Sequence, residues 1–156
     1  MKFYLFLLSF LLLIPCRSTA REIPSCLMSS GDGRSSSYAI LVDKKRQSLD
    51  LFKSSPQGPQ LVKQYRCTTG KDNNGSKHRE GDLRTPNGVY FFTGMREDET
   101  LPAKYGVRAF VMDYPNDYDR LQDKTGSGIW LHAVDDDSRV EISYDTEGCV
   151  VVTNDD

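Results

Sequence analysis

Residues 126–154 read GSGIWLHAVDDDSRVEISYDTEGCVVVTN and hold the clearest chemical signal in the chain. His132 ends a short apolar run, and Cys149 follows seventeen residues later, directly after Gly148. A thiol is a nucleophile only as the thiolate, and a neighbouring imidazole can take its proton. A glycine beside the thiol lets backbone N–H groups approach a developing oxyanion. The spacing predicts a catalytic cysteine–histidine dyad; taken alone, it also fits a buried free cysteine beside a surface histidine.

Apolar residues on both sides of the dyad predict that strands hold it. Ile129, Trp130 and Leu131 lead into the histidine, and Val150 to Val152 follow the cysteine. Short apolar runs of this kind are typical of buried strands. The three aspartates 135–137 between the two runs predict a solvated loop.

The first twenty residues have the features of a secretory signal peptide. Lys2 supplies a positive charge, Phe3 to Ile14 is an almost unbroken apolar run of twelve, and Ala20 is suited to cleavage after it. Twelve residues are too few for a comfortable bilayer span, so we expect no stable membrane insertion after cleavage. An uncleaved anchor and a lipidated Cys16 are the lesser alternatives. We therefore expect a signal peptide at 1–20, a linker at 21–37 and one exported domain at 38–156.

Charge and cysteine content narrow the function classes. The chain has 20 Lys and Arg against 22 Asp and Glu, which argues against a nucleic-acid partner. Cleavage after residue 20 leaves three cysteines, at positions 26, 67 and 149, so at least one thiol is unpaired. A Cys26–Cys67 disulfide would spare Cys149, but Cys67 fits equally well as a small core residue on a strand.

Short strands separated by turn signals fill the rest of the domain. Asn116 is placed to cap a short helix at 115–121. The sequence has no internal repeat, heptad pattern or long amphipathic helix, so it predicts a mainly β domain. Besides the two runs around the dyad, the predicted strands are residues 38–42 and 48–52, which form a hairpin, and then 60–68, 89–93 and 108–114.

Two other positions carry weaker signals. His78 lies between Lys77 and Arg79 in a glycine-punctuated loop, and we expect it to be solvated. With two histidines in the chain, no metal-ligand cluster can be assembled, so we expect no metal site. Arg84 either binds a substrate carboxylate or ties its own loop down.

Three segments, in this order, resemble the L,D-transpeptidase catalytic domain, also called the YkuD domain. They are EGDLRTPNGVYFF at 80–92, IWLHA at 129–133 and TEGCVVVTN at 146–154. PNDYDR at 115–120 is similar to the murein-transpeptidase branch found in diderm bacteria. The likeness covers residues 38–154 and follows a predicted signal peptide.

The resemblance implies a β-sandwich with a few short helices and no metal or organic cofactor. It implies a monomeric periplasmic enzyme that acts on peptidoglycan stem peptides and serves cell-wall organisation and cell shape. Cys149 would attack the carbonyl of a meso-diaminopimelate residue across an L–D peptide bond and form a thioester, which an amine of another stem or water would release. His132 would be the general base, and the backbone N–H groups of Gly148 and Cys149 would be the oxyanion donors.

The sequence departs from the family pattern beside the cysteine. Glu147 stands where the family commonly has a histidine, and its carboxylate would raise the thiol pKa unless it points to solvent or pairs with a base such as Arg139. Val150 to Val152 lack the Arg or Asn that commonly follows, so Arg84 and Arg108 become the candidates for binding a substrate carboxylate. Because Ala133 follows the base, we expect a backbone carbonyl to orient the imidazole.

Several functions stay open at this point. An L,D-transpeptidase leads, and an L,D-carboxypeptidase of the same fold would differ only in using water as the acceptor. Glu147 favours a wall-binding scaffold without chemistry, and a small disulfide-stabilised module would require an oxidised Cys149. The sequence stops at Asp156, where a helix covering the sheet would be expected, which predicts a fragment or an unusually short member.

Overall fold

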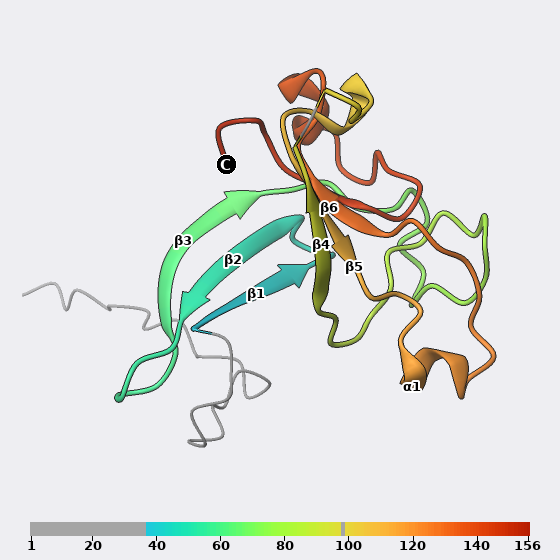
Figure 1. Ribbon diagram of the computed structural model, residues 1–156, viewed down its shortest axis with the longest axis horizontal. Helices are drawn as coiled ribbons and strands as arrows, with labels where there is room; N and C mark the ends of the chain where they lie inside the picture. The colour runs from blue at the N-terminus through green and yellow to red at the C-terminus, as the bar shows by residue number, and fades with distance from the viewer. Residues whose placement is uncertain (1–36, 98) are drawn as a thin grey trace, which may run out of the picture.

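The computed structural model describes residues 37–97 and 99–156, which form two β-sheets with three short helices around them (Figure 1). The predicted signal peptide and almost all of the predicted linker lie outside the described residues. Within the described part, no helix combines the length and apolar character needed to cross a bilayer. The prediction of a mainly β domain is confirmed.

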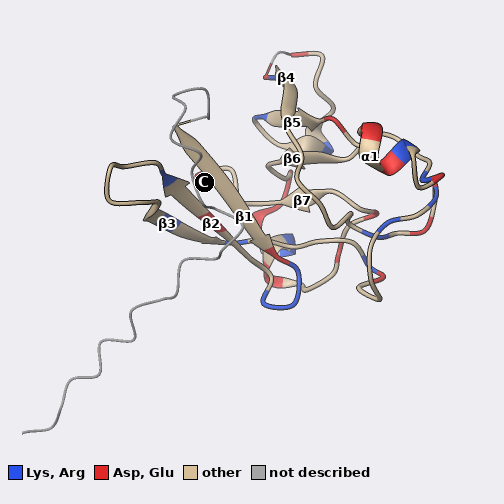
Figure 2. Cartoon of the chain, turned by 90° about the horizontal axis from the view of Figure 1, so that it is seen from below, with Lys and Arg blue, Asp and Glu red and all other residues tan. Residues whose placement is uncertain are grey.

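The first sheet contains β1 (Tyr38–Asp43), β2 (Ser48–Lys53) and β3 (Gln60–Arg66), antiparallel and in that order. The predicted hairpin is therefore present, and its basic turn is the blue loop between β1 and β2 in Figure 2. The Asp43 carboxylate closes this turn by accepting bonds from the backbone N–H groups of Lys45 and Arg46. Local side-chain bonds of this kind favour turns over a continued strand.

The second sheet contains the residues that flank the dyad. Its strands are β4 (Phe92–Arg96), β5 (Ala109–Met112), β6 (Trp130–His132) and β7 (Val150–Val151), in that order. The first three strands pair antiparallel, whereas β6 and β7 pair parallel. Thr68, just after β3, exchanges backbone hydrogen bonds of 2.9 and 3.0 Å with Val151, so β7 joins the two sheets.

The core lies where the two sheets meet. Leu49 from the first sheet and Cys67, directly after β3, pack with Leu131 and Val150 from the second sheet. Cys67 is a free thiol and fully buried, as expected of a small core residue, and burial raises its pKa to about 12. Its predicted alternative partner, Cys26, lies outside the described residues.

Most predicted strands differ from the observed ones at their ends; the strand predicted at 108–114, for example, spans Ala109–Met112. Two of the differences have a clear cause. The strand predicted at 89–93 instead begins at Phe92 and continues to Arg96. The preceding backbone is engaged by the loop near α1 (Asp117–Arg120): the Val89 carbonyl accepts from Asn116, and the Phe91 N–H donates to the Asp113 carboxylate. The strand predicted at 60–68 ends at residue 66 because the chain then turns to pair with β7.

The short helices lie at the ends of the second sheet. They are η2 (Ala103–Tyr105), α1 and η3 (Asp137–Glu141). Asn116 caps α1, as predicted, and forms a reciprocal capping box with Asp119. Residues 135–137 are exposed, as predicted, although the last of them already begins η3.

Candidate active site

The parallel pairing of β6 with β7 places the predicted dyad on one face of the sheet. Leu131 is paired with Val150, and His132 with Val151. Because side chains alternate along a strand, Leu131 and Val150 point into the shared core, and His132 and Cys149 share the opposite face. The two side chains are diagonal neighbours on adjacent chain segments.

His132 is held in an environment that keeps it neutral. Its side chain is buried, with 7% of its surface exposed, and the Tyr105 ring meets it edge-on at 4.9 Å between centroids. Burial lowers the pKa of His132 below its ordinary value of 6.5; the Ala133 hydrogen bond opposes this shift, and the positive charges of Arg139 and Lys104 add to it. As predicted, a backbone carbonyl orients the imidazole: Nδ1 of His132 is bonded to the Ala133 carbonyl oxygen, which can only accept a hydrogen bond. Nδ1 therefore carries the hydrogen, and Nε2 is left as the basic atom.

Cys149 is a partly buried free thiol. Its Sγ donates to the Gly128 carbonyl at 3.4 Å, and its side chain packs against a small cluster that includes Val151. Burial raises the pKa of Cys149, and the Glu147 charge adds to the rise. A hydrogen bond from the Trp130 backbone N–H and the charges of Lys104 and Lys77 oppose it.

The hydroxyl group of Thr146 holds the backbone turn that leads to Cys149. Thr146 Oγ1 accepts from the Gly148 N–H at 3.1 Å and donates to the Cys149 carbonyl at 2.7 Å. Gly148 adopts φ +134°, and a Cβ at this position would lie 2.8 Å from the Arg84 carbonyl oxygen. Only glycine fits this conformation and this close approach. Because the Gly148 N–H is used by Thr146, the Cys149 N–H is the remaining predicted oxyanion donor.

A buried polar network, which the sequence did not predict, holds the backbone at residues 144–146. Gln47, in left-handed backbone with φ 52°, bonds through its amide to Thr69 and accepts from the Tyr144 N–H at 3.1 Å. Thr68 Oγ1 accepts from the Asp145 N–H at 2.9 Å. These bonds connect the backbone at Tyr144 and Asp145, which leads into the turn before Cys149, to the first sheet. A lone glutamine after a basic turn carries no local pattern that would reveal this role.

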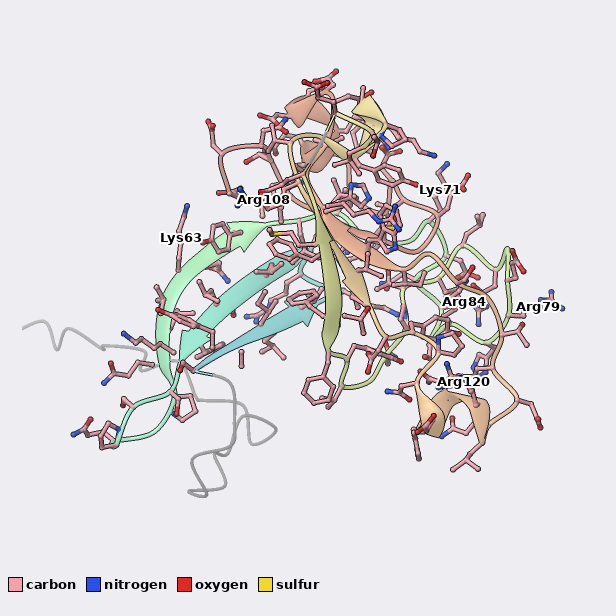
Figure 3. All side chains as sticks on the ribbon, in the orientation of Figure 1. Lys63, Lys71, Arg79, Arg84, Arg108 and Arg120 are labelled. Carbon is pink, nitrogen blue, oxygen red and sulfur yellow. The ribbon has the colours of Figure 1, made fainter. Side chains whose placement is uncertain are left out.

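The two predicted carboxylate-binding arginines have different surroundings. Arg84 forms an ion pair with Asp72 at 2.8 Å, and its carbonyl abuts Gly148, so its backbone belongs to the site. The guanidinium of Arg108 pairs with Glu97 at 2.8 Å. Figure 3 shows Arg108 on the other side of the second sheet from Lys71 and Arg84. The structure thus brings Arg84 close to Cys149 and does not bring Arg108 there.

Glu147 and His78 are both exposed. The suggested pairing of Glu147 with Arg139 is wrong, because Arg139 pairs with Asp145 at 3.0 Å and with Asp135 at 3.5 Å. The solvated position predicted for His78 is confirmed. Over residues 37–97 and 99–156, no group of three or more His, Cys, Asp or Glu side chains is placed to hold a metal ion.

The parallel strand pair presents a partly buried cysteine and a buried histidine on one face of the sheet. Residues 37–156 match the model of the L,D-transpeptidase catalytic domain, YkuD. The chain belongs to this family.

The chain is also similar to individual proteins of known sequence or structure. The chain is 26% identical over 129 residues to "Putative L,D-transpeptidase YafK" of Escherichia coli (strain K12). This match covers 78% of this chain and 51% of that protein. A solved structure of Bd1075 from Bdellovibrio bacteriovorus is 37% identical with a TM-score of 0.67, covering 83% of this chain and 44% of that one. The helical cell shape determining protein Pgp2 of Campylobacter jejuni, as its K307A mutant, is 30% identical with a TM-score of 0.65, covering 76% and 40%. The chain spans about half the length of the curated relative and less than half of these two structures.

Proposed function

We propose that this chain is an exported, cysteine-dependent L,D-transpeptidase that acts on peptidoglycan stem peptides through a thioester on Cys149. The observation that carries the proposal is the pairing of β6 with β7, which presents Cys149 and His132 on one sheet face. Family membership supplies the reaction class, and the name of Pgp2 supports a role in cell shape.

The charge states favour general-base catalysis over a preformed ion pair. The pKa of His132 is lowered and that of Cys149 is raised, so both groups are neutral near neutral pH. As Sγ attacks the scissile carbonyl, its proton passes to Nε2 of His132, and the imidazolium then protonates the leaving amine. The Cys149 N–H is the oxyanion donor. An amine of a second stem, or water, then attacks the thioester and frees the thiol.

Turnover of a defined stem peptide tests the proposal. The full chain is incubated with a stem peptide that carries the L–D bond after diaminopimelate, with and without a second stem as amine acceptor. The masses of the products are determined by mass spectrometry. We expect a cross-linked product that is lost in the Cys149→Ala variant. A shortened stem without cross-links would assign an L,D-carboxypeptidase instead, and an unchanged stem that still binds the folded chain would assign a scaffold.

A further inference from the structure

Two basic side chains lie over an aromatic shelf beside His132. The shelf consists of Tyr105 and Trp130, whose ring centroids are 4.7 Å apart. The Lys104 ammonium lies 4.9 Å from the Tyr105 centroid, and the Arg96 guanidinium lies 5.3 Å from the Trp130 centroid. Cation–π contacts at these distances hold the two charges near the rings.

Strand register places this group on the face that carries the dyad. Arg96 is paired with Ala109, and Ala109 is paired with His132, so these three positions share one face of the sheet. Trp130 lies two residues before His132 on β6 and therefore faces the same way. The Tyr105 ring contacts both Trp130 and His132, which brings Lys104 to the same place.

The charges of Lys104 and Arg96 lack a carboxylate partner within the part of the chain that the structure describes. Three other basic groups near the site are paired with acidic residues. These pairs are Arg84–Asp72, Lys77–Asp82 and Arg139–Asp145. Lys104 also lowers the pKa of both His132 and Cys149, so its field reaches both groups.

The turn that carries Lys104 is fixed in place. Gly106 has φ +63°, and a Cβ there would lie 2.5 Å from the Val134 backbone nitrogen. Asn154 accepts from the Val107 N–H at 3.0 Å and also bonds to the Val134 carbonyl. The backbone beside Lys104 is therefore fixed, while its exposed ammonium stays accessible to a ligand.

We propose that Lys104, assisted by Arg96, binds the side-chain carboxylate of the diaminopimelate residue whose carbonyl Cys149 attacks. This inference rests on the proposed function and adds a specificity determinant to it. Diaminopimelate differs from lysine by one carboxylate at the end of its side chain. A positive pair beside the reaction centre would therefore favour stems with diaminopimelate over stems with lysine.

Binding to an inactive variant tests the inference without requiring turnover. Two stem peptides, identical except for diaminopimelate or lysine at the attacked position, are titrated by calorimetry into the Cys149→Ala variant. We expect the diaminopimelate peptide to bind about tenfold more tightly, and the preference to shrink at high salt. Adding Lys104→Gln should weaken binding of the diaminopimelate peptide about fivefold and leave the affinity for the lysine peptide unchanged. Lys104→Arg should retain the preference.

Arg120→Gln is the matched control, because Arg120 lies on α1 and is paired with Asp117. It should leave both affinities unchanged. Equal affinities for the two peptides in Cys149→Ala, no binding of either, or equal weakening of both by a folded Lys104→Gln variant would overturn the inference. If the parent turns over both peptides equally well, the proposed function stands and this inference fails.

Discussion

Gly148 is a position beside Cys149 where the structure does not accommodate a side chain. Its positive φ and its approach to the Arg84 carbonyl both exclude a side chain. We expect Gly148→Ala to lower the free energy of unfolding by about 1–3 kcal/mol through backbone strain, and to slow acylation of Cys149. Thermal unfolding and intact-mass labelling measure the two effects.

Gly94 supplies the control for this change. A Cβ at Gly94 meets nothing within 4 Å, so Gly94→Ala should leave acylation at the parent rate. Equal behaviour of the two variants would contradict the role assigned to Gly148.

The charge state of Cys149 leads to a prediction about pH. Because burial raises the thiol pKa above its ordinary value of 9.0, alkylation by iodoacetamide should keep rising with pH past 9 and show no plateau near neutrality. At neutral pH, Glu147→Gln should speed alkylation about twofold, and Lys104→Gln should slow it by a similar factor. Rates are followed by intact mass, with Cys149→Ala as the blank.

A plateau reached below pH 7 in the parent would show a preformed thiolate–imidazolium pair. That result would contradict the general-base mechanism. Shifts of the same sign in the two charge variants would contradict the electrostatic assignment of Glu147 and Lys104.

The sequence predicted the backbone partner of His132, because that contact depends on a close neighbour. The catalytic role of Cys149 and His132 stays a prediction from residue type and spacing. The sequence did not predict that the Gly148 N–H is used by Thr146, which depends on turn geometry. Nor could it separate Arg84 from Arg108, because the face that a side chain occupies follows from strand pairing.

Among the structural elements, the loop at 77–84 is held by one carboxylate. Asp82 accepts from Lys77 Nζ at 2.8 Å and from the backbone N–H groups of His78, Arg79 and Arg84. Burial alone would raise the pKa of Asp82, but these bonds hold it well below its ordinary value of 3.8. The loop ends at Arg84, whose carbonyl abuts Gly148, so the carboxylate supports the site from a distance.

We expect Asp82→Asn to destabilise the protein by about 3 kcal/mol at pH 7, because it leaves the buried ammonium of Lys77 uncompensated. The folded-state pKa is depressed, so this stabilisation is complete above about pH 4 and is lost as pH falls toward the folded-state value. Denaturant unfolding at pH 7 and at pH 3 should therefore show a smaller difference between variant and parent at pH 3. A difference that grows at pH 3 would contradict the assignment.

The sequence predicted structural elements well where their contacts are local. The β1–β2 hairpin and the Asn116 cap depend on neighbours a few residues away, and both were predicted. β4 begins at Phe92 rather than Val89 because the backbone of Val89 and Phe91 is bonded to the side chains of Asn116 and Asp113, which are distant in the sequence. No local periodicity could have revealed it.

For the whole molecule, the decisive feature is that β7 joins the two sheets while holding Cys149 next to β6. Composition and turn signals predicted a mainly β domain, but a parallel pair of such short strands leaves little trace in a sequence. The chain matches the model of the catalytic domain over residues 37–156, and the match covers 51% of the curated relative. Acceptor choice and cellular role therefore stand as proposals for the protein as a whole.

In the proposed mechanism this fold makes Cys149 an activated nucleophile. The intact mass of the full chain is measured after incubation with a carbapenem, beside that of the Cys149→Ala variant. We expect one covalent adduct on the parent and none on the variant, with the buried Cys67 unlabelled. A folded parent that gains no adduct, or a variant that gains the same adduct, would contradict the account.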